Sequence, residues 1–261
     1  MLGKNLKNAA LALMISGATG TVVGMELLEL MQQVKPADLA KFGENLNVQD
    51  LLALVKGLAD QVTISDDVAA TLASMERVAT ANMYTIPSKI LGLDLEQFKA
   101  GALSQAAITD VQQKLPIMIT FLKNPDLAIS VFTALVLPEL EKSLKVVEGG
   151  KAVLAPVKAF LNFAKETPAI KDIARSFADI LLKVQPKLSQ PQEFIAAYQA
   201  AYNEALPIIR NAIASNASAL IPILKDFKKI QLTPAIIGAL IKTQSKVKET
   251  VEEIVGMFGG G

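Results

Sequence analysis

The 261-residue chain contains no cysteine and no histidine. Without cysteine, a disulfide framework, a thiol nucleophile and a thiolate metal site are all excluded. Without histidine, Ser-His-Asp and Cys-His catalysis are excluded, together with zinc sites of the usual nitrogen and sulfur type. Carboxylate or lysine chemistry is still allowed, but no spacing of those residues demands it. We therefore predict a protein that is not an enzyme, with no cofactor, no metal and no catalytic residue.

The chain also has almost no net charge and few aromatic residues. The 26 basic and 25 acidic residues nearly cancel, so the chain has no long-range field that would attract nucleic acid, and we expect no such partner. Tryptophan is absent and aromatic residues make up 5%, so a chain that is 51% apolar must form a mainly aliphatic core. No stretch alternates apolar and polar residues for the length of a β-strand, so we predict that the regular structure is helical.

The longest uncharged stretch lies near the start, between Lys7 and Glu26. On a helix its small residues would line one face and allow another backbone to approach closely. These small residues recur at every fourth position, at Ala12, Ser16, Gly20 and Gly24. Three interpretations stay open: a buried core helix, a hairpin that enters a membrane, and a secretory signal. Together they favour a secreted, periplasmic or membrane-associated location over a cytoplasmic one.

The next part of the chain reads as short helices. Apolar residues at spacings of three and four predict an amphipathic helix over 48–62, with Leu51, Leu54 and Val55 on its apolar face. Ser65 is expected to cap the helix that follows and that runs to about residue 82. Asp94 stands three residues before Gln97, which is capping-box spacing for another helix start.

Three proline corners organise the rest of the chain: Asn124-Pro125, Thr167-Pro168 and Thr233-Pro234. Asn or Thr is expected to cap the incoming helix, and proline suits its first position, where the missing N–H costs little. We expect a hairpin across each corner, with an extra helix over 191–214. The expected hairpins are 105–123 with 125–148, 151–165 with 168–184, and 216–230 with 234–258. Further prolines should kink helices or mark first turns: Pro138, Pro156, Pro207 and Pro222.

Two local motifs resemble functional ones without meeting their requirements. The run Glu148-Gly149-Gly150-Lys151 lacks the earlier glycine and the following Ser or Thr of a phosphate-binding loop, so it predicts a helix stop and restart. Asn216 begins a glycosylation acceptor sequence, but it stands where a helix should start and is expected to cap it.

The fold class that follows is all-α, an array of about ten to twelve helices in mostly antiparallel hairpins. The Thr-Pro-Ala-Ile tetrapeptide at two corners suggests divergent helical repeats, but the spacing between corners is not constant, so convergence on a favourable turn is equally consistent. We predict one domain over 1–261. It divides into an apolar N-terminal hairpin (1–35), short helices (36–103) and a helical-hairpin region (104–258).

Two groups of side chains are candidate binding residues. One is an aromatic stripe on a single helix face, which could line an apolar ligand pocket or belong to the core: Phe194, Tyr198 and Tyr202. The other is a set of lysines interleaved with apolar residues, which could lie on an anionic membrane or decorate a solvated helix: Lys225, Lys228 and Lys229.

These observations support a functional hypothesis and an alternative. The hypothesis is a non-enzymatic helical protein that binds lipid, membrane or another apolar small molecule, with the N-terminal segment as a membrane or core element. The alternative is a soluble helical scaffold that binds a protein partner or self-associates through its extended surface.

Overall fold

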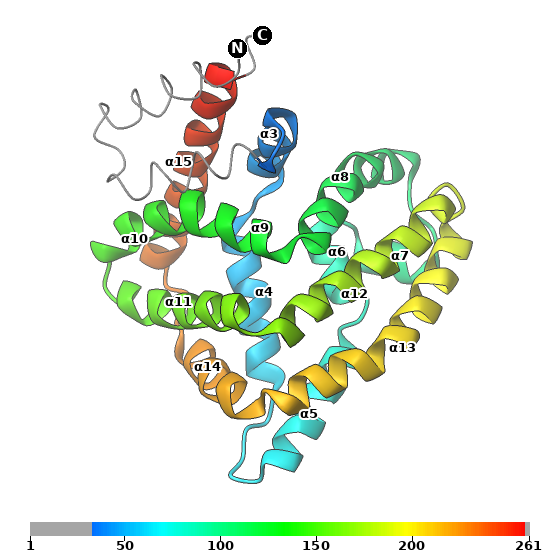
Figure 1. Cartoon of the computed structure of the whole chain (residues 1–261), viewed down its shortest axis with the longest axis horizontal. Helices are drawn as coiled ribbons and strands as arrows, with labels where there is room; N and C mark the ends of the chain where they lie inside the picture. Colours follow the sequence, from blue (N-terminus) through cyan, green and yellow to red (C-terminus); the bar gives the residue numbers. More distant parts are fainter. Residues whose placement is uncertain (1–32, 259–261) are drawn as a thin grey trace.

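The computed structural model describes residues 33–258, and all regular structure in that range is helical (Figure 1). The predicted all-α, multi-helix class is confirmed. The apolar N-terminal stretch with Ala12, Ser16, Gly20 and Gly24 lies outside the described residues, so its role stays a prediction.

The first half of the described chain consists of short helices followed by one long helix. They are α3 (Pro36–Asn45), α4 (Val48–Gln61), α5 (Val68–Ala81), α6 (Thr85–Leu91), α7 (Leu95–Ala100) and α8 (Gln105–Lys123). Asp94 caps α7 as expected, because its carboxylate accepts from the Gln97 N–H at 2.8 Å. The predicted cap of α5 at Ser65 is wrong. Asp67, immediately before the helix, accepts from the Ala69 N–H at 2.9 Å, and the Ser65 hydroxyl donates to the Asp67 carbonyl.

The second half begins with two short helices and continues with longer ones. The ends of the longer helices fall within two residues of the predicted ends. The helices of this half are α9 (Pro125–Val131), α10 (Leu137–Lys145), α11 (Gly150–Glu166), α12 (Pro168–Val184), α13 (Pro191–Ser215), α14 (Ala217–Lys229) and α15 (Pro234–Phe258). A 3₁₀ turn, η2 (Gln185–Lys187), precedes α13.

The predicted single helix over 125–148 is wrong, because a π-helical turn, η1 (Phe132–Val136), separates α9 from α10. The Leu137 N–H donates to the Phe132 carbonyl, five residues back, in place of the usual four. Pro138 follows directly and has no N–H to offer the preceding turn. The proline therefore accounts for the local widening of the helix.

The proline corners place Pro125, Pro168 and Pro234 in the first helical turn, as predicted. Capping at these corners is confirmed only at Thr233, whose hydroxyl accepts from the Ile236 N–H at 3.3 Å. The Asn124 and Asn216 side chains do not cap the next helix. Each amide instead donates backwards to a carbonyl of the preceding helix, at 3.0 and 2.8 Å.

The hairpin partners predicted across the three corners are wrong. Only Asn124 separates α8 from α9, and only Thr167 separates α11 from α12. One residue cannot reverse the chain and set two helix axes 8–10 Å apart, so each corner is a bend with contact near the joint. Helix α15 leaves α14 and packs along α10 and α3. The long packed pairs are α12 with α13, α8 with α12, and α11 with α14 (Figure 1).

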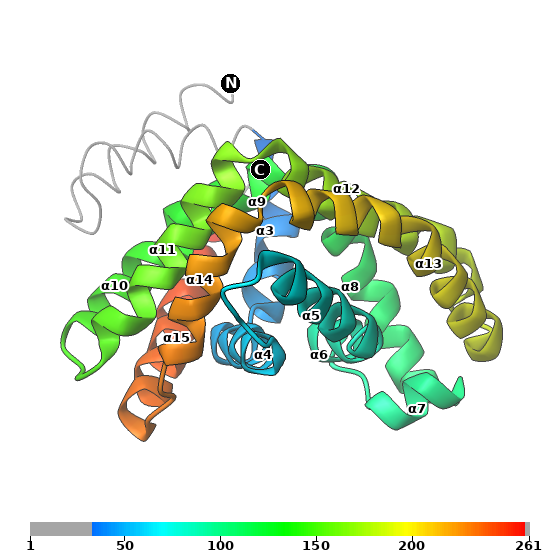
Figure 2. The ribbon, with the colours of Figure 1, turned by 90° about the horizontal axis from the view of Figure 1, so that it is seen from below.

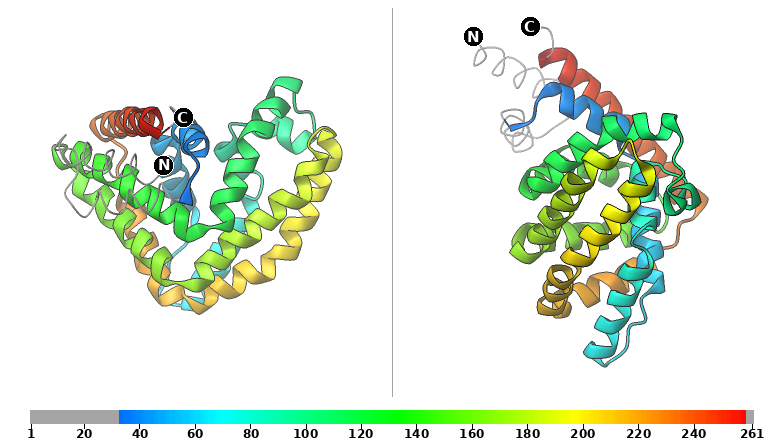
Figure 3. Two further views of the ribbon diagram at one scale, coloured as in Figure 1. Left: turned by 45° about the horizontal axis from the view of Figure 1, so that its top comes forward. Right: turned by 90° about the vertical axis from the view of Figure 1, so that its right-hand side faces the viewer.

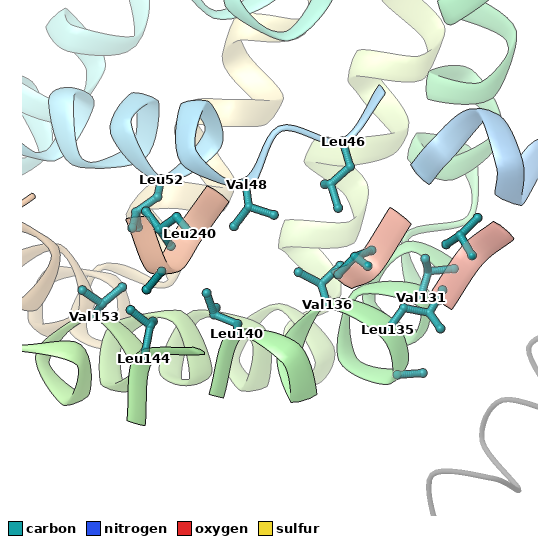
Figure 4. Close-up of a cluster of buried hydrophobic side chains, with 14 of the residues drawn as sticks. Leu46, Val48, Leu52, Val131, Leu135, Val136, Leu140, Leu144, Val153 and Leu240 are labelled. Carbon is teal, nitrogen blue, oxygen red and sulfur yellow. The ribbon is translucent and has the colours of Figure 1, made fainter. Parts of the chain in front are cut away.

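The helices form two arms, each with its own core (Figures 2 and 3). The first core joins α3, α4, α9, α10, α11, α14 and α15. In Figure 4, Val48 and Leu52 lie near Leu140, Leu144 and Leu240 within this core. The second core joins α6, α7, α8, α12 and α13, and it contains the aromatic rings of Phe98, Phe194 and Tyr198. A smaller cluster holds α5 against α4 and α14.

Candidate ligand-binding groove

A cavity of about 480 Å³ lies where the two arms meet. Its walls come from α3, α4, α9 and η1 on the side of the first core, and from α6, α8, α12 and α13 on the side of the second. We call this cavity the groove. Its volume falls within the range of small-molecule sites. Apolar side chains dominate its lining, among them Leu54, Ile90, Ile117, Met118, Phe121 and Phe132.

Aromatic residues from separate helices build one side of the groove. The rings of Phe42 from α3 and Phe121 from α8 lie 5.3 Å apart, centroid to centroid, at a tilt of 56°. Phe132 joins the lining from the π-helical turn, a type of irregularity that is often found at functional sites. The widened turn buries its next residues, Ala134 to Val136, in the first core. One short element therefore faces both the core and the groove.

The mouth of the groove carries exposed apolar side chains. Leu51 on α4 is 36% exposed and Ile90 on α6 is 42% exposed, although both line the groove. Val55, one turn after Leu51, is 39% exposed. Exposed apolar residues that gather around a hollow indicate a binding site, whereas single ones elsewhere do not.

The charged residues at the rim of the groove are mostly positive. Three lysines line the groove, Lys41, Lys89 and Lys114, but among residues 33–258 the only carboxylate in its lining is that of Asp50. Asp50 is held by Asn47: the Asn47 amide donates to its carboxylate at 2.7 Å, and the Asp50 N–H donates back at 2.9 Å. This exchange caps the start of α4.

The three rim lysines differ in their contacts. The Lys114 ammonium lies 2.5 Å from Asp110 and also donates to the Leu91 carbonyl at 3.4 Å, at the end of α6. Lys41 and Lys89 are exposed, and neither forms an ion pair with any residue in the range 33–258. The rim thus offers two cations without a described counter-charge.

The predicted aromatic stripe lies in the second core, and each member is at most 2% exposed. The Tyr198 hydroxyl donates to the Met83 carbonyl at 2.7 Å, and the Tyr202 hydroxyl donates to the Ala79 carbonyl at 3.1 Å. Burial raises the pKa of both phenols, so they stay protonated and keep donating at neutral pH. Of the stripe, Tyr198 reaches the groove lining, whereas Phe194 and Tyr202 pack behind it. Ligand contact by this stripe stays a prediction.

The predicted lysine set on α14 does not act as one surface. The Lys228 ammonium reaches the end of α4 and donates to the Ala59, Asp60 and Val62 carbonyls, at 3.1, 3.0 and 2.8 Å. Lys229 pairs with Asp226 at 2.8 Å, and Lys225 is exposed. A membrane-surface role for these three residues stays a prediction.

Residues 33–258 hold no group of three or more acidic side chains that could bind a metal ion. None of the helices described there combines the length and the apolar character needed to cross a bilayer.

Sequence reasoning missed most of the groove, because its walls come from elements far apart in the chain. One signal was present on α4. Its predicted apolar face held Leu51, Leu54 and Val55, yet the residues that enter the first core are Val48, Leu52 and Ala59. The helix therefore carries more apolar surface than one core needs. Two residues of this excess, Leu51 and Leu54, line the groove.

Comparison with known proteins gives weak similarities. No family model matches the chain, and no solved structure matches it. The flavin prenyltransferase UbiX of Escherichia coli strain K12 is 24% identical over 196 residues, which cover 72% of this chain and 96% of that protein. UbiX of Salmonella typhimurium is 26% identical over 157 residues, 57% of this chain and 78% of that protein. Identities of this size do not place the chain in that family.

Proposed function

We propose that this protein is a non-enzymatic helical protein that binds a lipid or another apolar ligand in the groove. The observation that carries the proposal is the apolar groove itself, open at the junction of two otherwise closed cores, with Leu51 and Ile90 exposed at its mouth. A ligand that covers these side chains would remove apolar surface from water, which is the main favourable term in such binding.

The energetics favour a long alkyl chain over a short one. Burial contributes about 0.8 kcal/mol per methylene, so about twelve methylenes contribute roughly 10 kcal/mol. Loss of translational and rotational freedom opposes binding by at least about 4 kcal/mol. The remaining 6 kcal/mol or so corresponds to a Kd on the order of 10⁻⁵ to 10⁻⁴ M. Short chains would not offset the cost of association.

A groove-filling variant tests the proposal. Ala128, on α9, is half-buried and lines the groove, so Ala128→Phe should occupy part of the volume a ligand needs. Wild-type protein titrated with the neutral fluorescent probe N-phenyl-1-naphthylamine should show saturable enhancement that dodecan-1-ol reverses. Ala128→Phe should bind the probe at least about tenfold more weakly, the equivalent of roughly two lost methylene contacts.

The matched control is Ala196→Phe, which adds the same ring to an exposed position of α13 outside the groove and should bind the probe like wild type. Circular dichroism would show that both variants keep their helices. Equal probe affinity in all three proteins, or no binding by wild type, would contradict the proposal. Concentration-dependent association without probe binding would favour the scaffold alternative.

The weak similarity to flavin prenyltransferases favours one more specific ligand. Those proteins are named for the transfer of a prenyl group to a flavin, and a prenyl group is a branched apolar hydrocarbon of the kind this lining would accept. Addition of a flavin together with a prenyl phosphate, whose phosphate would leave as the prenyl group joins the flavin, and measurement of the visible absorption of the flavin would test this candidate. A shifted flavin spectrum and a prenylated product would overturn the non-enzymatic proposal.

A further inference from the structure

We infer that the ligand of the groove is a single-chain fatty acid, with its alkyl tail among the apolar walls and its carboxylate at the lysine rim. This inference rests on the proposed function and makes it specific, because it assigns the charge and orientation of the ligand. The observation behind it is the unequal rim of Lys41, Lys89 and Lys114 around an apolar lining.

The net positive charge of the rim favours an anionic ligand. Asp50, the one carboxylate that the described residues bring to the lining, already accepts from the Asn47 side chain, and Asp110 partly neutralises Lys114. Lys41 and Lys89 add two positive charges that no described acidic residue compensates. The head group of a cationic amphiphile would be repelled by these charges, and a neutral head group would not compensate them. An anionic head gains from them.

The ammonium of Lys114 further defines the rim at the end of α6. It bonds the Leu91 carbonyl and lies 3.5 Å from the point where a side chain at Gly92 would begin. Lys89 belongs to the last turn of α6 itself, so Lys89 and Lys114 both lie at the C-terminal end of α6. Lys41 is the third lysine of the lining, and it comes from α3.

The apolar lining favours a tailed ligand over a free anion. Exposed lysines bind a small carboxylate weakly, because water and salt screen their charge. The cavity, about 480 Å³, lies toward the lower end of the range for ligand sites, which favours one acyl chain over a two-chain lipid. Tail and head therefore act together. The alkyl tail of the ligand supplies affinity, and the lysines select a negatively charged head group.

The test compares two ligands of equal chain length on lysine variants of the full chain. Dodecanoate and dodecan-1-ol would each displace N-phenyl-1-naphthylamine from wild type and from the double variant Lys41→Gln/Lys89→Gln. The double variant should bind dodecanoate about fivefold more weakly and bind dodecan-1-ol unchanged, since only the ion contacts are removed. Added sodium chloride should weaken dodecanoate binding to wild type and leave dodecan-1-ol unaffected.

Lys151→Gln is the control, because this exposed lysine on α11 is not part of the groove lining. It should match wild type with both ligands. Acetate, which has the head without the tail, should not displace the probe. The inference is overturned if the double variant binds dodecanoate like wild type, or if it loses both ligands equally. Failure of both ligands to bind wild type would instead remove the proposed function itself.

Discussion

Gly150→Ala is expected to destabilise the protein by about 3 kcal/mol, at the upper end of the cost of overpacking. Gly150 is the buried first residue of α11, next to the end of α10. A methyl group there would collide with the Leu144 carbonyl oxygen, and it would lie 2.8 Å from the carbonyl carbon and 3.1 Å from Cβ of that residue. Because the obstacle is backbone, no side chain can turn aside. The two helices would have to separate.

That separation would open the first core, because Leu144 and Val153 are completely buried where α10 and α11 meet. At roughly 2–4 °C per kcal/mol for a domain of this size, the melting temperature should fall by about 6–12 °C. Thermal unfolding followed by circular dichroism would measure it. The control is Gly238→Ala on α15, where a methyl group meets nothing within 4 Å. That variant should gain about 0.5–1 kcal/mol from helix propensity. A Gly150→Ala protein as stable as wild type would contradict the packing of α10 on α11.

Lys228→Met is expected to cost about 2 kcal/mol, although lysine is usually a residue of little consequence on a helix surface. The Lys228 ammonium donates to three carbonyls at the end of α4. The Ala59 carbonyl also accepts from the Val62 N–H, whereas the last carbonyls of a helix have no partner within the helix itself. Hydrogen bonds from charged donors contribute about 1.5–3 kcal/mol, and partial exposure reduces the effect. Methionine keeps the length and apolar stem of lysine and removes only the charged donor.

Lys56 reinforces the same contact from the other side, since its ammonium donates to the Lys228 carbonyl at 3.2 Å and pairs with Asp60 at 3.0 Å. The neighbouring Lys229→Met is the matched control: its exposed pair with Asp226 should contribute less than about 0.5 kcal/mol. Urea unfolding would measure how much each variant lowers the free energy of unfolding. Equal midpoints for Lys228→Met and Lys229→Met would show that the Lys228 hydrogen bonds to the end of α4 do not stabilise the protein.

The sequence was most informative about where helices begin. Proline fixes its own backbone angle and lacks an N–H, so the first helical turn suits it, and Pro125, Pro168 and Pro234 all lie there. Proline alone does not mark a helix start, because four other prolines lie inside helices: Pro116, Pro156, Pro207 and Pro222. Side-chain capping was less predictable. The Asn124 and Asn216 amides bond the helix behind them, an alternative that is equally local and that depends on the exact bend of the chain.

Helix partners could not be predicted from the corners alone. A corner fixes the bend between two helices but not which distant apolar face covers each of them. Helix α15 packs on α3, from the opposite end of the described chain, and this pairing carries no local signal. The groove was missed for the same reason. Phe42, Phe121 and Phe132 meet in it from three helical elements, and each alone reads as an ordinary core residue.

Methyl resonances of isoleucine test most directly whether an apolar ligand binds in the groove. Ile86, Ile90 and Ile117 line it, whereas Ile180 and Ile254 are buried in the two cores outside it. Full-length protein labelled at isoleucine methyl groups would be titrated with dodecanoate and followed by carbon–proton correlation spectra. If an apolar ligand binds in the groove, the methyl groups of Ile86, Ile90 and Ile117 should show saturable shifts, and those of Ile180 and Ile254 should not move. Shifts confined to other isoleucines, or no saturable shift at all, would contradict binding in the groove.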